Sequence, residues 1–429
     1  MIIVDTALAR RKAENRPIRV GLVGAGYMGA GIVRQIENHI DGMTVIAVSN
    51  RTVHKAEDAY KAAGINELVR VDTPEQLDNA ASNRVRVVTD DPLVLCAAGN
   101  VDVIIEGTGE IEFGAKVVTA AIENRKHTIM MGAELDATVG PLLRTYADRA
   151  GVVISNTDGD QPGVMMNLYR FVKTIGYHPV LAGNIKGLQD YYRTPDTQRE
   201  FARKNNLTAK MATAFADGTK MSMENAIVAN ATGFRTGKRG MYGPVCRHAN
   251  DAASLFPVEQ MLNGGLVDYI LGAQPGPGVF VIGHNADETR ADYMRYFKMG
   301  DGPFYVFYVP YHLPHLEAPL TVARAALFQD AAITPIGPPV CEVIAIAKRD
   351  LESGEVLDGI GGFTCYGVIE NAPVRKAENL LPMGLSEGCR LIRNIKKDEP
   401  LTFDMIELPP DRLVNQLWEA QERHFNHAS

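Results

Sequence analysis

The stretch Ile18-Arg-Val-Gly-Leu-Val-Gly-Ala-Gly-Tyr-Met-Gly29 decides the fold of the N-terminal part of the chain. Residues 18–23 form a β-like run, glycines follow at 24, 26 and 29, and apolar residues then recur at helical spacing as far as Ile36. A strand, a GxGxxG turn and a helix in this order are typical of a parallel α/β sheet that binds a dinucleotide.

The glycine turn predicts contacts with a pyrophosphate group. The first two glycines allow a tight turn and a close approach of the phosphates, the third lets the helix pack on the strand, and the start of the helix offers unpaired N–H donors. The alternative is a tightly packed turn that binds nothing. We expect the contacts at Gly24, Gly26, Tyr27, Met28 and Gly29.

The end of the next strand predicts which coenzyme is bound. The run 44–48 ends about 20 residues beyond the glycines, where a residue that reads the ribose is expected. The sequence there is Ser49-Asn50-Arg51, and it has no acidic residue that would repel a 2′-phosphate. These three residues therefore favour NADPH over NADH, whereas the alternative places Arg51 in a solvated loop.

A further strand, 101–105, ends in Glu106-Gly107-Thr108-Gly109. We expect Thr108 and Gly109 to border the nicotinamide ring, because ligands of open α/β sheets collect at the carboxyl edge. Glu134 follows the strand 128–131 and is a candidate catalytic residue at the same edge, or else a carboxylate that favours the start of a helix. Alternating strands and helices up to residue 155 predict an NADP-binding Rossmann domain over 1–155.

The segment Asp158-Gly-Asp160 carries two carboxylates on either side of a glycine. Oxygen ligands with this spacing suit Mg²⁺ or Mn²⁺, or orient a polyhydroxylated substrate. The alternative is a helix cap or an Asx turn before Pro162.

Lys220 lies in the first turn of a helix predicted to run to about Asn230. A cation there opposes the helix dipole unless an anionic partner or a developing negative charge compensates, which favours a catalytic role over that of a surface lysine. Glu224 lies on the same face four residues later, in the order that is less favourable for a purely stabilising pair.

The segment 232–244 combines four glycines with Arg235, Lys238 and Arg239. It predicts a mobile cationic loop that closes over a phosphate or carboxylate of the substrate, or an ordinary solvated turn. From about residue 335 short strands and glycine turns follow, with a helical tail. We therefore expect an α+β catalytic domain over 156–335 and a small β-rich domain with a C-terminal helix over 336–429.

Composition limits the class of protein. The 429 residues have 46% hydrophobic and 22% charged side chains, which excludes a wholly disordered chain, and a net charge of −7, which opposes a general affinity for nucleic acid. Five cysteines without a CxxC pair indicate neither a disulfide framework nor a zinc ribbon. The N-terminus lacks the apolar core of a signal peptide, and no segment has about 18 consecutive apolar residues. We expect a cytoplasmic homo-oligomer without a membrane partner.

Several motifs together resemble a known family. The segments 132–141, 158–163, 217–220 and 239–244 are similar to homoserine-dehydrogenase-related oxidoreductases with a C-terminal SAF domain, and residues 342–408 resemble the SAF part. Within that group the sequence looks like the 1-deoxy-D-xylulose 5-phosphate reductoisomerase-like type.

The resemblance implies an NADPH-dependent reductive isomerisation of 1-deoxy-D-xylulose 5-phosphate to 2-C-methyl-D-erythritol 4-phosphate, a step of isoprenoid precursor synthesis. It implies a divalent ion on Asp158, Asp160 and Glu224, with Lys220 neutralising the developing negative charge. Together with Glu134 at the sheet edge, Lys220 and Asp160 are the candidate catalytic residues. The substrate would be a small phosphorylated sugar-like molecule held by Arg235, Lys238 or Arg239.

Two other functions remain open. One is a simple dehydrogenase of a homoserine-like or sugar-acid substrate, with Lys220 assisting proton transfer and no obligatory metal. The other is a non-catalytic NADP-binding sensor or scaffold.

Overall fold

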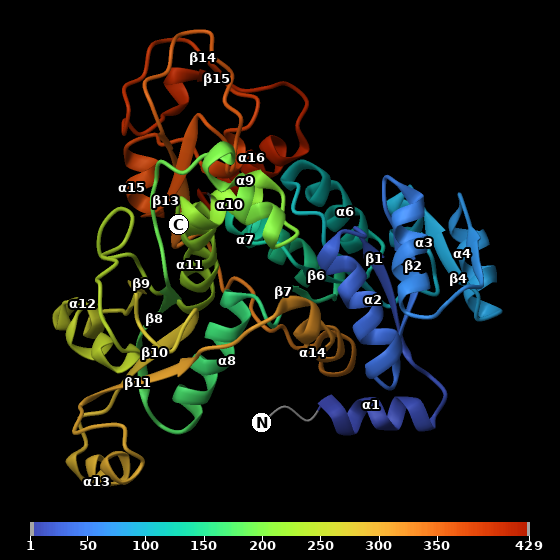
Figure 1. The fold of residues 1–429 in the computed structure, drawn as a ribbon, viewed down its shortest axis with the longest axis horizontal. Coiled ribbons are helices and arrows are strands. Elements are labelled where there is room, and N and C mark those ends of the chain that lie inside the picture. Colours follow the sequence, from blue (N-terminus) through green and yellow to red (C-terminus); the bar gives the residue numbers. More distant parts are fainter. Residues whose placement is uncertain (1–3, 427–429) are drawn as a thin grey trace. The chain divides into compact units, whose positions relative to one another are not determined.

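The computed structural model describes residues 4–426, which form two compact units (Figure 1). Among these residues, the first unit combines 4–160, 313–334 and 416–426, and the second combines 161–312 and 335–415. The predicted domains 1–155, 156–335 and 336–429 stay a prediction.

The first unit is built on a parallel seven-stranded sheet in the order β3-β4-β2-β1-β5-β6-β7. The predicted α/β class is confirmed. The inner strands are continuous apolar runs, as expected for strands covered on both faces. The order reverses between β1 and β5, which places a binding crevice at their carboxyl ends. The strands are β1 (Ile18–Val23), β2 (Met43–Ser49), β3 (Leu68–Arg70), β4 (Arg86–Thr89), β5 (Val103–Glu106), β6 (His127–Met130) and β7 (Ile154–Asn156).

The helices of this unit connect and cover the strands (Figure 1). Their starts follow the local sequence: a capping box between Thr73 and Gln76 begins α4, and the Asp91 carboxylate accepts the Leu93 N–H at the start of α5. The helices are α1 (Val4–Ala13), α2 (Tyr27–His39), α3 (Val53–Ala62), α4 (Pro74–Ser82), α5 (Pro92–Ala97), α6 (Ile111–Glu123), α7 (Glu134–Ala150) and α14 (Pro314–Phe328), with most of α16 (Leu413–Asn426).

The second unit contains a four-stranded sheet in the order β11-β10-β8-β9, in which only the β8–β9 pair is parallel. Helix α11 is buried along nearly its whole length and packs against this sheet, as does α8. The elements are β8 (His178–Lys186), β9 (Leu266–Leu271), β10 (Gly278–His284), β11 (Phe304–Val309), α8 (Gln161–Thr174), α9 (Pro195–Lys204), α10 (Ala209–Ala216), α11 (Thr219–Thr232), η1 (Ala249–Ser254), α12 (Val258–Leu262) and α13 (Glu288–Tyr296).

The C-terminal part of the second unit is rich in short strands and turns, as predicted. Helix α11 also packs against the strand pair that β12 and β13 form in this part, where the Thr219 hydroxyl accepts the Gly367 N–H at 2.8 Å. The SAF assignment itself stays a prediction. The elements are β12 (Cys341–Ala347), β13 (Cys365–Asn371), α15 (Ala372–Ala377), η2 (Met383–Leu385), β14 (Arg390–Leu391), η3 (Phe403–Met405) and β15 (Ile406–Glu407). Within residues 4–426, no helix has the length and apolar character needed to cross a membrane.

Candidate functional site

The glycine turn after β1 has the geometry of a phosphate-binding loop. Gly24 has φ +103°, and a Cβ there would lie 2.9 Å from the Gly107 carbonyl oxygen. A Cβ at Gly29 would collide with the Gly24 carbonyl oxygen, so helix and strand approach as closely as glycine allows. A Cβ at Gly26 would meet nothing within 4 Å. The turn is therefore tight on its protein side and open at Gly26, the position where a pyrophosphate is expected to approach.

The loop after β2 is tied to this turn. The Asn50 side-chain oxygen accepts the Ala25 N–H at 3.0 Å, and its amide nitrogen donates to the Thr52 carbonyl at 2.9 Å. Ser49 is buried at the end of β2, whereas Arg51 is exposed. Asn50 thus positions the glycine turn, and Arg51 is accessible to a 2′-phosphate.

The loop after β5 is held by Glu106, which was not among the predicted site residues. Its buried carboxylate accepts the Thr108 N–H at 2.8 Å and the Thr108 hydroxyl. Burial raises the pKa of Glu106, and the nearby Glu134 carboxylate adds to this. Because Gly107 contacts Gly24, the structure brings the predicted residues Thr108 and Gly109 beside the glycine turn.

His315 lies against the first turn of α2. Its Nδ1 is 3.2 Å from the Met28 sulfur, and its ring meets the Tyr27 ring edge-on with centroids 6.2 Å apart. Helix α14 begins at Pro314, because proline suits the first position of a helix.

The first turn of α7 stands at the carboxyl edge of β6 and carries two acids. Glu134 is the first residue of the helix, as both of its predicted roles require. Asp136 is buried, and burial raises its pKa to about 7. The catalytic role of Glu134 stays a prediction.

The acidic residues after β7 are buried and make contacts within the first unit. The Asp158 carboxylate accepts the Thr321 hydroxyl at 2.8 Å and lies 3.6 Å from Arg324, so α14 already satisfies it. Asp160 is buried directly before α8. Glu224 belongs to the second unit, and no three His, Cys, Asp or Glu side chains within residues 4–426 are grouped to hold an ion. The metal role expected of Asp158, Asp160 and Glu224 stays a prediction.

Glu224 is instead the centre of a lysine cluster in the second unit. Its Oε1 is 4.0 Å from Lys220 Nζ, and its Oε2 is 3.3 Å from Lys186 Nζ. The carboxylate is fully buried, whereas the two lysine side chains remain 17% and 18% exposed. The predicted pairing of Lys220 with Glu224 is present, and the prediction missed Lys186, the last residue of β8.

Two asparagines fix the orientation of this carboxylate. Asn184 donates to Glu224 Oε2 at 2.8 Å, and Asn225 donates to the Asn184 side-chain oxygen at 2.7 Å. Both are buried. Asn184 and Lys186 are two residues apart on β8, so their side chains point to the same face of the sheet and reach α11 together. A polar Asn-x-Lys end to an otherwise apolar strand is the sequence signal that could have revealed them.

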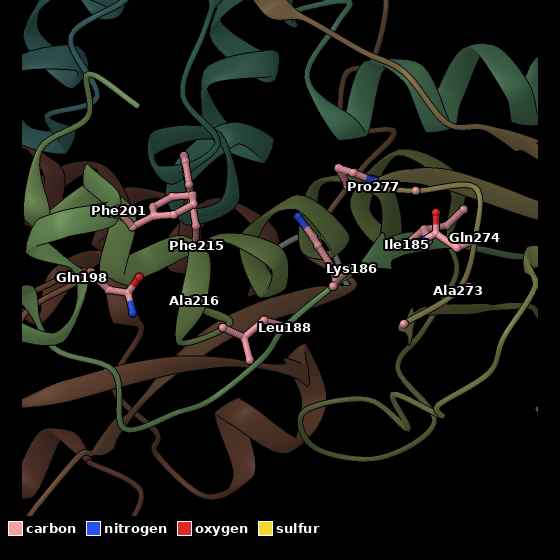
Figure 2. A pocket seen from close by; sticks show the side chains of 14 residues that line it. Ile185, Lys186, Leu188, Gln198, Phe201, Phe215, Ala216, Ala273, Gln274 and Pro277 are labelled. Carbon is pink, nitrogen blue, oxygen red and sulfur yellow. The ribbon is translucent and has the colours of Figure 1, made fainter. Parts of the chain in front are cut away.

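A cavity of about 420 Å³ adjoins the cluster (Figure 2). Lys186 and Phe215 are among its lining residues, and Lys220 Nζ lies 5.2 Å from the centroid of the Phe215 ring. The cluster therefore sits beside a space large enough for a small molecule.

The predicted cationic loop is fastened rather than mobile. The Asp268 carboxylate accepts the N–H groups of Tyr242 and Gly243, both at 2.9 Å. Arg239 pairs with Glu370 at 2.7 Å and Glu378 at 2.6 Å, so its guanidinium contributes to the packing of this unit, and its role as a phosphate anchor stays a prediction.

The two other cations of this loop remain accessible. Arg235 and Lys238 are exposed, and the Lys238 ammonium lies over the Tyr242 ring. Their substrate role stays a prediction.

Comparison with known proteins identifies relatives for parts of the chain. The family model for the catalytic domain of oxidoreductase DRL matches residues 159–318, a range that contains Lys186, Lys220 and Glu224. A homoserine dehydrogenase of Bacillus subtilis is 29% identical over 136 residues, covering 32% of this chain and 28% of the relative. Inositol 2-dehydrogenase 4 of Saccharopolyspora erythraea is 34% identical over 143 residues, covering 31% of this chain and 41% of the relative.

A solved myo-inositol dehydrogenase of Lactobacillus casei, in complex with NAD(H) and myo-inositol, overlaps this structure with a TM-score of 0.39 at 15% identity, covering 69% of this chain and 75% of that one. The chain thus spans less than half of the two curated relatives and is similar, over 159–318, to the catalytic domain of an oxidoreductase.

Proposed function

We propose that the protein is a pyridine-nucleotide-dependent oxidoreductase of the dehydrogenase type, which reduces the carbonyl group of a small substrate and oxidises the corresponding alcohol in reverse. The observation that carries this proposal is the glycine turn, tight at Gly24 and Gly29 and open at Gly26. The names of the relatives support a dehydrogenase, and the oxidoreductase match over 159–318 supports a catalytic role for the lysine cluster.

NADPH is the proposed coenzyme. The residues at the end of β2 are a serine, an asparagine and an exposed arginine, without a carboxylate that would repel the 2′-phosphate. When bound, the coenzyme supplies the hydride.

The lysine cluster is the proposed acid–base machinery. In reduction, the Lys220 ammonium donates its proton to the carbonyl oxygen as that oxygen becomes a hydroxyl, and in oxidation the neutral amine takes the proton back. Glu224 stabilises the ammonium form of Lys220, and Lys186 stabilises negative charge that develops on the substrate. Asn184 and Asn225 are positioning residues, because they hold the Glu224 carboxylate.

Coenzyme binding and turnover test these assignments separately. Calorimetric titration with NADPH and NADH measures the cofactor site without any substrate. Oxidation of NADPH at 340 nm in the presence of a panel of aldehydes, ketoses and 2-oxo acids then measures the reaction. Lys220→Met should retain NADPH binding and lose at least about a hundredfold in turnover. Absence of binding with both coenzymes would refute the proposal.

Reductive isomerisation of 1-deoxy-D-xylulose 5-phosphate is the second candidate. The observation that favours it is the presence of two lysines, Lys186 and Lys220, beside the Glu224 carboxylate. Rearrangement of a ketose builds negative charge on two neighbouring oxygens, and two ammonium groups would stabilise that charge. Exposed Arg235 and Lys238 would then receive the phosphate.

Product analysis separates the candidates. Mass spectrometry and NMR of the reaction with 1-deoxy-D-xylulose 5-phosphate would reveal 2-C-methyl-D-erythritol 4-phosphate for a reductoisomerase, and an unrearranged alcohol or no product for a simple dehydrogenase. NADPH binding without turnover of any substrate, together with a cellular role that survives Lys220→Ala, would indicate a sensor or scaffold.

A further inference from the structure

We propose that the cavity beside Lys186 binds the apolar alkyl or aryl group of a carbonyl substrate whose single anionic group is held by the Lys186 ammonium. The substrate class is thus a monoanionic oxo acid with an apolar body rather than a polyol. This inference rests on the proposed dehydrogenase function, and binding experiments test it independently of turnover.

The walls of the cavity are mainly apolar (Figure 2). They come from the end of β8, from α9 and α10, and from the turn between β9 and β10. Phe201 and Leu188 line the cavity although they are 51% and 52% exposed, so they leave apolar surface for a ligand to cover. The apolar lining residues are Ile185, Leu188, Phe201, Ala212, Phe215, Ala216, Ala273 and Pro277.

Lys186 and Gln198 are two of the polar side chains that line the cavity. Lys186 stands at one wall with its ammonium held by Glu224, which fixes the position of the cation. Gln198 also lines the cavity and is only 7% exposed. Its side-chain amide can donate to or accept from a polar atom of a ligand.

The same lining disfavours a polyhydroxylated occupant. Each hydroxyl group that enters gives up hydrogen bonds to water, and one left without a partner costs on the order of 1–3 kcal/mol. Lys186, Gln198 and Gln274 are the polar side chains that line the cavity. An apolar body instead gains from burial against the phenyl rings and aliphatic walls.

The test compares two probes of equal charge on the full-length protein. The probes are 4-methyl-2-oxopentanoate, with a branched alkyl body, and D-erythronate, with hydroxyl groups in its place. Isothermal calorimetry in the presence of saturating NADP⁺ measures binding without reaction. We expect 4-methyl-2-oxopentanoate to bind at least about tenfold more tightly than D-erythronate.

Paired variants locate the site. Phe201→Ser should lower the affinity for 4-methyl-2-oxopentanoate about tenfold. Tyr296→Ser removes an aromatic ring that is 82% exposed on α13, and it should leave this affinity unchanged. Lys186→Met should weaken it about tenfold or more, Lys186→Arg should retain most of the affinity, and Lys204→Met, on the exposed end of α9, should have no effect.

Equal affinity for the two probes, tighter binding of D-erythronate, or binding that survives Phe201→Ser would overturn the proposal. If NADP⁺ itself does not bind, the proposed function fails, and the same titrations on the coenzyme-free protein still test the cavity. If 4-methyl-2-oxopentanoate binds as expected but NADPH is not oxidised, the cavity assignment stands and the reaction assignment fails.

Discussion

Replacement of Gly26 by alanine should separate coenzyme binding from folding. The backbone at Gly26 has φ −73° and ψ −168°, which alanine adopts without strain, and its Cβ would meet nothing within 4 Å. The unfolding free energy should therefore stay the same or rise by up to about 1 kcal/mol, because alanine has less freedom in the unfolded chain.

The same methyl group would occupy the space where the diphosphate approaches the turn. We expect the diphosphate to lose two charge-assisted hydrogen bonds to the turn, each worth about 1.5 kcal/mol. The total of about 3 kcal/mol weakens the binding of NADPH by about a hundredfold. Calorimetry with NADPH and denaturant unfolding of the coenzyme-free protein measure the two effects on the same sample.

Two further glycines provide the controls. Gly29→Ala should destabilise the coenzyme-free protein by about 1–3 kcal/mol, because its Cβ collides with the Gly24 carbonyl oxygen. Gly337→Ala, at an open position outside the turn, should change neither quantity. Gly26→Ala that binds NADPH as tightly as the wild type, or that loses binding only through unfolding, would refute the role of the glycine turn in coenzyme binding.

Three other perturbations test separate residues. Arg51→Ala should lower the preference for NADPH over NADH by about tenfold with little change in NADH affinity, and an unchanged ratio of dissociation constants would remove the 2′-phosphate role. Addition of EDTA should leave turnover unchanged, because Thr321 and Arg324 satisfy Asp158; inactivation that Mg²⁺ reverses would contradict this. Burial raises the pKa of Asp136 from 3.8 to about 7, so the native protein keeps a proton that the unfolded chain has released between pH 4 and pH 7, and stability falls as the pH rises through this window. At pH 8 the free energy of unfolding of Asp136→Asn, measured by denaturant titration, should exceed that of the wild type by on the order of 1–4 kcal/mol. Near pH 4 the two proteins should be equally stable. Equal stability at both pH values would contradict the pKa shift.

The parallel sheet could be predicted because its signals are local. The strand at 18–23, the glycines and the helix that follows are contiguous, and each depends on its own sequence more than on distant partners. The residues at the ends of β1, β2 and β5 could be placed together for the same reason, since parallel strands align their carboxyl ends at one edge. Glu106 was missed as a site residue because only its burial and its bonds to Thr108 distinguish it from a strand-end acid.

The lysine cluster could be predicted only in part, because one half is local and the other is not. Lys220 and Glu224 are four residues apart on one helix, so helical spacing predicts their contact. Lys186 and Asn184 are 38 and 40 residues from Glu224, and packing of β8 on α11 brings them to it. The ion pair of Arg239 with Glu370 could not be predicted for the same reason, because this partner lies 131 residues away and leaves no trace in the loop sequence.

The lysine cluster is costly for the fold, and this cost is itself an argument for function. A fully buried carboxylate such as Glu224 is tolerated when cations and hydrogen-bond donors compensate it, and an apolar side chain of similar volume often serves stability at least as well. Here two lysines and an asparagine converge on that carboxylate beside an apolar cavity, and both ammonium groups stay partly exposed. The ion pair of Lys348 with Asp217 in the same unit differs, because there the lysine is almost fully buried as well. The partial exposure of Lys186 and Lys220 beside the cavity supports the proposed contact of these lysines with a substrate.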